Sequence, residues 1–139
     1  MDNLYLVKKA FEAQKFSYSP YSNFQVGAAL LSTSGKVYSG CNIESASYSP
    51  TNCAERTAFF KAVSEGELNF SKIAVVGNHA SGRKPDDDFA APCGVCRQVM
   101  MEFCHQDFEI ILAKTEDDFK VFTLSELLPL GFGPANLKE

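Results

Sequence analysis

Two short cysteine segments, far apart along the chain, constrain the fold of this 139-residue sequence more than any other feature. The first is Cys53-Ala54-Glu55 and the second is Pro92-Cys93-Gly94-Val95-Cys96. Each is followed by a stretch without helix breakers, so each cysteine group is predicted to open a helix. If one metal ion binds all three thiols, the two helix starts must face each other in the folded chain.

Three cysteine thiols can occupy three of the four positions around a zinc ion and leave the fourth for water, as catalytic zinc sites do. The first turn of a helix carries positive partial charge, which lowers the pKa of a thiol there and favours the metal-binding thiolate. Glu55 lies two residues after the first thiol, where a carboxylate can move protons to and from that water. The pattern predicts one zinc ion held by Cys53, Cys93 and Cys96, with Glu55 as the proton carrier.

Each part of this pattern has a simpler interpretation when it stands alone. A Cys-x-x-Cys pair also occurs in redox sites and structural zinc sites, and Cys53 alone is typical of a small buried side chain. Asn52-x-x-Glu55 resembles a capping box, in which Glu55 would only stabilise the helix start. No fourth ligand stands out, since His79 falls in a predicted loop and His105 follows the second cysteine-led helix. The joint pattern is much more specific than its parts.

Hydrophobic spacing and turn residues predict a mixed α/β domain that spans residues 1–139. The breaker-rich run Pro129–Pro134 is expected to end the ordered part, and the loop 78–91, with its acidic run at 86–88, is expected to form a solvated bulge. The expected elements are a helix at 3–15, strands at 25–33 and 37–41, a helix at 53–65 ended by Gly66, a strand at 72–77, a helix at 93–103, strands at 109–113 and 119–122, and a short helix through Leu128 capped by Thr123 or Ser125.

Composition argues against several classes of protein. The net charge of −4 argues against a protein that binds a nucleic-acid backbone. No apolar run approaches the roughly 20 residues that a membrane helix needs, and the segment Met1–Leu4 lacks the basic and apolar regions of a secretory signal. Five cysteines are an odd number, which fits reduced thiols better than a disulfide framework. We therefore expect a cytoplasmic protein with no nucleic-acid or membrane partner.

Several segments together resemble the short, homotetrameric type of cytidine deaminase, and the resemblance covers nearly the whole chain. The segments are Tyr21–Ala29, Asn42-Ile43-Glu44, Cys53–Arg56, Pro92–Gln98 and the Leu127–Pro129 run before Phe132. The visible departure is the loop 78–91, which is longer than usual. The resemblance implies a three-layer α-β-α sandwich with a mixed five-stranded sheet. It also implies zinc-dependent conversion of cytidine and deoxycytidine to uridine and deoxyuridine, with release of ammonia, in pyrimidine salvage.

Further residues acquire roles through the same resemblance. Asn42 and Glu44 lie two apart on a segment that we expect to be extended, so both side chains point to one side and can share a sugar hydroxyl. The resemblance implies that they bind the ribose 3′-hydroxyl, that Phe24 lies over the substrate, and that Phe132 reaches the active site of a neighbouring subunit. Backbone groups around Ala54 are expected to contact the pyrimidine edge.

Arg56 is expected to offset the charge of the metal centre. Three thiolates on Zn²⁺ leave a net charge of −1, which would weaken the metal as a Lewis acid. The guanidinium of Arg56 can donate hydrogen bonds to thiolate sulfurs. By residue type alone, an exposed position on the helix surface would be the simpler interpretation.

Three rival functions remain open at this point. The first is deamination of a related cytosine nucleoside antibiotic, against which Asn42 favours a plain nucleoside. The second is a polynucleotide deaminase, which the acidic balance disfavours. The third is a non-catalytic zinc or redox module, which would leave Glu55 without a role. The apolar tail after Leu128 is too rich in breakers to pack as a regular element, so Leu130 and Phe132 either fold back onto their own domain or pack on another subunit. The resemblance favours the second arrangement, a homotetramer.

Overall fold

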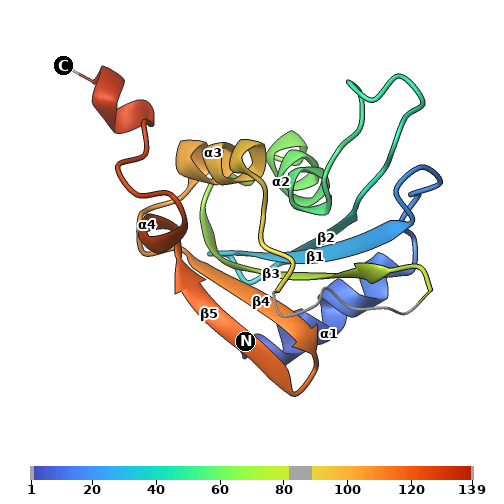
Figure 1. The fold of residues 1–139 in the computed structure, drawn as a ribbon. Coiled ribbons are helices and arrows are strands. Elements are labelled where there is room, and N and C mark those ends of the chain that lie inside the picture. Colours follow the sequence, from blue (N-terminus) through green and yellow to red (C-terminus); the bar gives the residue numbers. More distant parts are fainter. Residues whose placement is uncertain (1, 82–88, 139) are drawn as a thin grey trace.

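A five-stranded sheet in the order β2-β1-β3-β4-β5 organises the computed structural model, which describes residues 2–81 and 89–138 (Figure 1). β1 is antiparallel to both β2 and β3, β3 is parallel to β4, and β4 is antiparallel to β5. The sheet is therefore mixed, as predicted. The strands are β1 (Phe24–Ser32), β2 (Val37–Cys41), β3 (Phe70–His79), β4 (Glu109–Thr115) and β5 (Asp118–Thr123).

Helices cover both faces of the sheet and make three layers. α1 (Asn3–Gln14) lies on one face, and α2 (Ala54–Ser64) and α3 (Gly94–Phe103) lie next to each other on the opposite face (Figure 1). This confirms the predicted α-β-α arrangement. The short helix α4 (Leu124–Leu127) follows β5, and the 3₁₀ helix η1 (Pro134–Leu137) ends the described chain. Within the described residues, no helix is long and apolar enough to cross a membrane.

The side chains of the central strands alternate between two apolar layers. In β1, Ala28 and Leu30 pack beneath α2 and α3, whereas Ala29 and Leu31 pack against α1. Residues 73–76 of β3 are all buried, because helices lie on both faces of that strand. The two apolar layers hold α2 and α3 in place on one face, where their N-terminal ends meet.

A glycine in β2 sets how closely α2 approaches the sheet. A Cβ atom at Gly40 would lie 2.6 Å from the carbonyl oxygen of Ala54 and 2.6 Å from the amide nitrogen of Ala58. Only a residue without a side chain allows the first turn of α2 to lie this close to the strand. This contact places the start of α2, and with it Cys53, over the side of the sheet formed by β2 and β1.

The predicted helices and strands appear within two residues of their expected ends, and the differences are local. β3 runs from Phe70 to His79, so the first two residues of the predicted loop 78–91 belong to the strand. The prediction that order ends at Pro129–Pro134 is wrong, since η1 forms with Pro134 at its first position. The predicted acidic bulge at 86–88 lies outside the described residues. Gly66 follows α2 with φ +93°, as expected of a glycine at a helix C-terminus.

Candidate metal centre and active site

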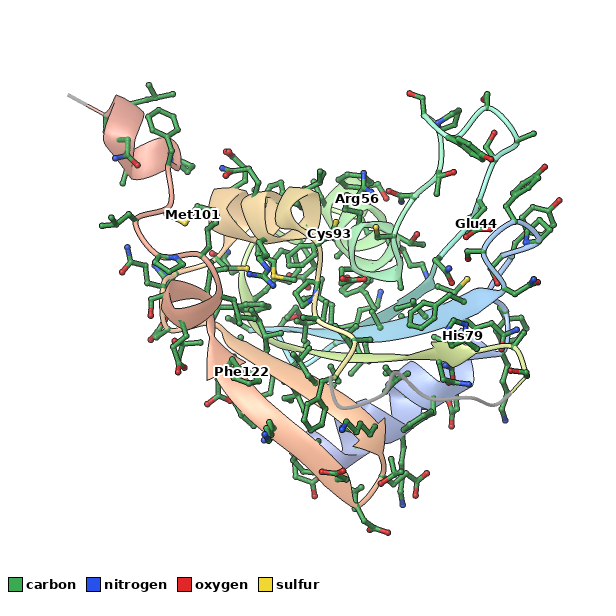
Figure 2. The ribbon with its side chains drawn as sticks, in the orientation of Figure 1. Glu44, Arg56, His79, Cys93, Met101 and Phe122 are labelled. Carbon is green, nitrogen blue, oxygen red and sulfur yellow. The ribbon has the colours of Figure 1, made fainter. Side chains whose placement is uncertain are left out.

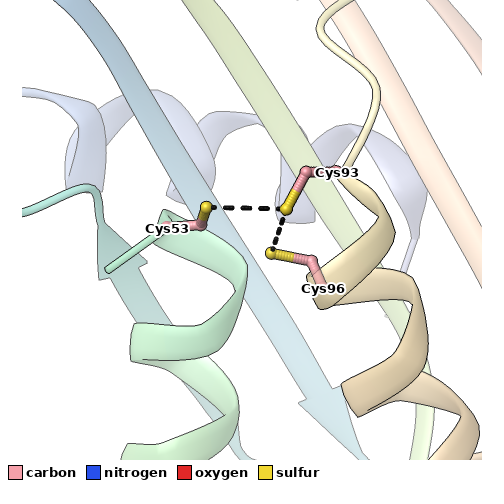
Figure 3. Close-up of side chains that lie close together, drawn as sticks. All are labelled: Cys53, Cys93 and Cys96. Carbon is pink, nitrogen blue, oxygen red and sulfur yellow. Dashed lines mark hydrogen bonds between the residues drawn. The ribbon is translucent and has the colours of Figure 1, made fainter. Parts of the chain in front are cut away.

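The three cysteines converge where α2 and α3 begin (Figure 3). Cys53 is the N-cap residue of α2, Cys93 is the N-cap residue of α3, and Cys96 lies in the first turn of α3. Cys53 Sγ is 3.8 Å from Cys93 Sγ, and Cys93 Sγ is 3.5 Å from Cys96 Sγ. All three sulfur atoms lie within 4.8 Å of one another. The two helix starts face each other, as the spacing of the cysteines predicts.

The geometry of the thiols fits a zinc ion. A tetrahedron with Zn–S bonds of about 2.3 Å has edges of about 3.8 Å, close to the observed sulfur separations. Among residues 2–81 and 89–138, these cysteines are the one group of three or more metal-binding side chains that lie this close together. Three ligands leave one position of the tetrahedron open, which is typical of catalytic zinc sites.

Hydrogen bonds favour the thiolate form of Cys53. The hydrogen bond with Cys96, and then the one from Arg56, lower the pKa of the Cys53 thiol to about 5, against the opposing effect of burial. Arg56 Nη2 donates to Cys53 Sγ at 3.2 Å. Figure 2 shows Arg56 on α2 beside the start of α3, where Cys93 is labelled. The guanidinium that we expected to offset thiolate charge thus lies in contact with one of the sulfurs.

Arg56 also has one unused donor. Its Nε is buried and has no hydrogen-bond partner within the described part of the chain. A buried donor without a partner carries a desolvation cost. The contact from Nη2 to Cys53 nevertheless places the positive charge of Arg56 beside a site that carries net negative charge when all three thiols bind Zn²⁺ as thiolates.

Glu55 is buried in the first turn of α2, next to the thiol cluster. Only 4% of its surface is exposed. Burial, followed by the nearby charge of Cys53, raises the pKa of the Glu55 carboxyl to about 7. A carboxyl group with a pKa near neutrality can both accept and donate a proton at physiological pH. The capping-box interpretation does not describe this helix start, because Cys53 is the N-cap and Asn52 Nδ2 instead donates to Thr57 Oγ1 at 3.2 Å.

One cavity of about 480 Å³ brings most of the predicted site residues together. It is large enough for a nucleoside-sized ligand. The predicted residues that line it are Phe24, Asn42, Glu44, Cys53, Ala54, Glu55 and Cys93. Sequence reasoning missed other lining residues, including Ser22, Thr51, Ala90 and Ala91. Small apolar residues close to a cysteine motif carry no distinctive pattern, so Ala90 and Ala91 gave no signal.

Phe132 lies outside this cavity, on the C-terminal segment after α4. Its side chain is 58% exposed, and its carbonyl oxygen accepts a hydrogen bond from Gln98 Nε2 at 2.7 Å. The next residue, Gly133, lies so close to Met101 that a Cβ atom there would be 2.9 Å from Met101 Cγ. The segment is therefore held against α3 while the Phe132 ring points away from the core of its own chain.

Asn42 and Glu44 face the cavity from one extended segment, as expected. Asn42 Oδ1 accepts hydrogen bonds from Val26 N–H, at 2.9 Å, and from Ser17 Oγ. Asn42 Nδ2 donates to the Phe24 carbonyl at 2.8 Å. These contacts fix the direction of the amide, so that its second Nδ2 hydrogen remains for a ligand.

The Glu44 carboxylate is held by a turn that leads into β1. Glu44 Oε1 accepts from the N–H groups of Tyr21 and Ser22 at 3.0 and 3.1 Å, and Oε2 accepts from Ser22 Oγ at 2.5 Å. Partial burial would raise the pKa of Glu44, but these three hydrogen bonds outweigh it and hold the pKa below its ordinary value. Glu44 is therefore an ionised hydrogen-bond acceptor among the residues that line the cavity.

Comparison with known proteins identifies close relatives of this chain. The family model for the zinc-binding region of cytidine and deoxycytidylate deaminases matches residues 1–112. The cytidine deaminase of Halalkalibacterium halodurans is 48% identical over 139 residues, which cover 100% of both chains. The cytidine deaminase of Sporosarcina psychrophila is 44% identical, covering 99% of this chain and 96% of the relative.

Solved structures agree with these sequence comparisons. The crystal structure of cytidine deaminase from Burkholderia pseudomallei matches with a TM-score of 0.85 at 44% identity, covering 95% of this chain and 100% of the other. The structure of cytidine deaminase from Mycobacterium tuberculosis matches with a TM-score of 0.77 at 34% identity, covering 96% and 98%. The fold and the sequence therefore point to the same group of proteins.

Proposed function

Because this chain belongs to the zinc-binding family of cytidine and deoxycytidylate deaminases, we propose that it hydrolyses cytidine and deoxycytidine to uridine and deoxyuridine, with release of ammonia. The observation that carries the proposal is the position of Glu55. It is a buried carboxyl with a pKa near 7, and it lies beside three converging thiols in a nucleoside-sized cavity. A structural zinc site or a redox pair has no use for such a group.

Cys53, Cys93 and Cys96 would hold one zinc ion, which when bound supplies a water molecule of lowered pKa. Glu55 moves the protons in this proposal. Its carboxylate accepts a proton from the attacking water and delivers it to N3 of the pyrimidine ring. The water oxygen bonds to C4, and Glu55 then carries the remaining proton of that oxygen to the amino group, so that the C4–N bond breaks and ammonia leaves. Burial of Glu55 keeps its pKa in the range where both directions of transfer are accessible.

The remaining residues of the cavity would bind the substrate. Asn42 offers an N–H and Glu44 offers an ionised acceptor, and a ribose 3′-hydroxyl can accept from the first and donate to the second. Phe24 would lie against the substrate, and backbone groups of Ala54 would contact the edge of the pyrimidine. Arg56 would offset the thiolate charge through its contact with Cys53.

The same proposal includes the oligomeric state and the cellular location of the enzyme. We infer one catalytic domain over residues 1–139 that acts as a homotetramer, with Phe132 completing a neighbouring subunit's site. Support comes from exposed apolar side chains on the side of α2 and α3, where Phe60 is 49% exposed and Val95 57% exposed, together with Phe132. Free thiols at all described cysteines suit the cytoplasm, where pyrimidine salvage would use this activity.

A spectrophotometric assay tests the proposed activity directly. Zinc-loaded protein should convert cytidine and deoxycytidine to the uracil nucleosides, with one ammonia released per nucleoside consumed. Free cytosine should be a poor substrate, because it has no hydroxyl for Asn42 and Glu44 to bind. A cytosine nucleoside antibiotic serves as the competing substrate. The proposal would be wrong if the zinc-loaded protein consumed only that compound, or turned over cytosine as fast as cytidine.

A further inference from the structure

The hydroxyl of Ser22 links two residues of the proposed substrate site. Ser22 Oγ accepts a hydrogen bond from the N–H of Phe24 at 3.0 Å and donates one to Glu44 Oε2 at 2.5 Å. A serine hydroxyl has one proton to give. Because the Phe24 N–H approaches the oxygen from the acceptor side, the proton of Ser22 is directed toward the carboxylate.

The turn around Ser22 is shaped to make these contacts. Asn23 has φ +56°, a left-handed conformation that asparagine tolerates better than most residues. Its N–H donates to the Ser19 carbonyl at 3.0 Å, and its own carbonyl accepts from Ala80 N–H at 2.7 Å. The bend at Asn23 brings the Phe24 N–H back to Ser22 Oγ. Both ends of the turn are thereby tied to neighbouring backbone.

Three donors from this turn leave the Glu44 carboxylate one main site for a ligand. The carboxylate has about four lone-pair sites in its plane. The N–H groups of Tyr21 and Ser22 occupy Oε1, and the Ser22 hydroxyl occupies one side of Oε2. The remaining position on Oε2 is the one available to a substrate hydroxyl at the cavity wall.

The peptide groups of Phe24 connect the two polar residues of the site. The Phe24 N–H reaches Glu44 through the Ser22 hydroxyl, and the Phe24 carbonyl accepts directly from Asn42 Nδ2. One residue whose ring lines the cavity therefore sets the direction of both sugar-binding groups through its backbone. The connection to Glu44 passes through the side chain of Ser22. It can therefore be removed by substitution without changing either Glu44 or Asn42.

We propose that Ser22 is a positioning residue that orients Glu44 to accept the 3′-hydroxyl of the nucleoside. The inference rests on the proposed function and adds a residue to it. Ser22 is exposed, so its hydrogen bonds contribute little to the free energy of unfolding. The role of Ser22 is to hold the Glu44 carboxylate in one orientation, since recognition of a hydroxyl depends on a fixed acceptor.

Kinetics on two nucleosides test this role. Zinc-loaded wild type, Ser22→Ala and Ser22→Thr are compared on cytidine and on 3′-deoxycytidine. Ser22→Ala should raise KM for cytidine about 10-fold, with kcat changed less than about 3-fold, and should leave KM for 3′-deoxycytidine within about 2-fold of wild type. Ser22→Thr keeps a hydroxyl and should restore the cytidine KM to near its wild-type value.

Ser34→Ala is the matched control. Ser34 Oγ, on the β1–β2 turn, also donates to a carboxylate, Glu67 Oε1 in the loop between α2 and β3, at 2.6 Å, but neither residue of this exposed pair lines the substrate cavity. Loss of that bond should change neither KM. Equal losses on both nucleosides in Ser22→Ala would indicate a general structural role and overturn the proposal, as would unchanged kinetics on both.

A second readout needs no substrate. NMR titration of the Glu44 side-chain carboxyl should give a higher pKa in Ser22→Ala than in wild type and Ser22→Thr, because one donor to the carboxylate is lost. The other ionisable groups that line the cavity, Glu55, Cys53 and Cys93, are the same in all variants. If wild type deaminated no nucleoside, the proposed function would fail, yet this titration would still decide whether Ser22 holds Glu44. An unchanged pKa would reject it.

Discussion

Arg56 Nη2 lies 3.2 Å from Cys53 Sγ, so the residue that follows the proposed catalytic glutamate donates to one of the proposed metal ligands. Around the first turn of α2, the chain carries a proposed metal ligand, a proposed proton carrier and a positively charged side chain. Because all three are held at the start of one helix, a change in the charge of the Cys53 thiolate alters the electrostatic environment of both the Arg56 guanidinium and the Glu55 carboxyl.

Arg56→Gln should weaken the metal centre without unfolding the protein. Loss of the guanidinium removes a hydrogen bond and a positive charge from the Cys53 thiolate, and losses of this kind cost about 10- to 100-fold in metal affinity or activity. Competition with a colorimetric chelator measures the zinc affinity. Lys61→Gln is the control, since it removes a cation from the same helix that instead contacts the Ser39 carbonyl. Equal zinc affinity in both variants would contradict the role of Arg56.

Replacing any of Cys53, Cys93 and Cys96 by alanine should lose zinc and activity together. Two remaining thiolates cannot hold an open site tightly, because metal affinity depends on the number of ligands. Zinc content by atomic emission and the cytidine assay should fall in parallel. Cys41→Ala and Cys104→Ala, which change cysteines outside the thiol cluster, should keep both. A purified, active protein without stoichiometric metal would rule the site out.

The metal centre could be predicted from sequence because its signals are local. Each cysteine group opens a helix, and a helix start has a fixed direction for its first side chains. The ends of β3 could not be predicted in this way. The strand extends to Phe70 and His79 because those residues pair with Ser32 and Phe24 of β1, which is a tertiary effect.

The turn that holds Glu44 could not be predicted from the sequence either. Ser22 and Glu44 are distant in sequence, and no periodicity links a serine in one loop with a carboxylate in another. A weaker signal existed for η1, where Pro134 stands at a helix start and Asn136 accepts the Gly133 N–H at 2.8 Å. Local sequence patterns were enough to predict the candidate metal ligands and the helices. The contacts between loops could be identified only in the folded structure.

Glu55→Gln should keep zinc and fold but lose most turnover. Glutamine has nearly the same shape as glutamate and cannot carry a proton, and proton transfer of this kind contributes about 10²- to 10⁴-fold. The variant should bind zinc with wild-type stoichiometry while kcat falls by at least about 100-fold. Glu65→Gln changes an exposed glutamate just past the end of the same helix and should have no effect. Near wild-type turnover in Glu55→Gln would show that Glu55 has only a structural role.

Cys104 should stay protonated up to strongly alkaline pH. Burial raises the pKa of its thiol to about 12, so the folded protein keeps a proton that the unfolded chain releases near pH 9. The contribution of Cys104 to the free energy of unfolding is therefore present below pH 9 and is lost as the pH rises toward 12.

Alkylation measures this pKa in the folded, zinc-loaded protein. At pH 8, iodoacetamide should modify Cys104 about 100- to 1,000-fold more slowly than a cysteine in a short unfolded peptide, because the thiolate is correspondingly scarce. Peptide mass spectrometry follows the reaction, and urea-unfolded protein is the control, in which the rate should rise to that of the peptide. Fast modification of the folded protein would contradict the burial of this thiol.

Phe132 should act on a neighbouring subunit rather than on its own. The ring is 58% exposed and lies on a segment fixed to α3 through Gln98 and Met101, so it cannot turn back into the cavity of its own chain without breaking those contacts. Phe132→Ala should raise KM for cytidine and leave zinc content unchanged. Leu68→Ala, which truncates an exposed apolar residue in the loop after α2, is the matched control.

Mixing two impaired chains distinguishes the neighbour's site from the chain's own. Glu55→Gln supplies an intact Phe132 but no proton carrier, whereas Phe132→Ala has Glu55 and lacks the ring. If Phe132 serves the adjacent subunit, hybrids refolded from both chains should bind cytidine more tightly than Phe132→Ala alone, because intact rings then meet intact Glu55 sites. Sedimentation should give four times the mass of the 15.3 kDa chain. A fully active monomer, or hybrids that bind cytidine no more tightly than Phe132→Ala alone, would show that Phe132 does not contribute to a neighbouring subunit's site.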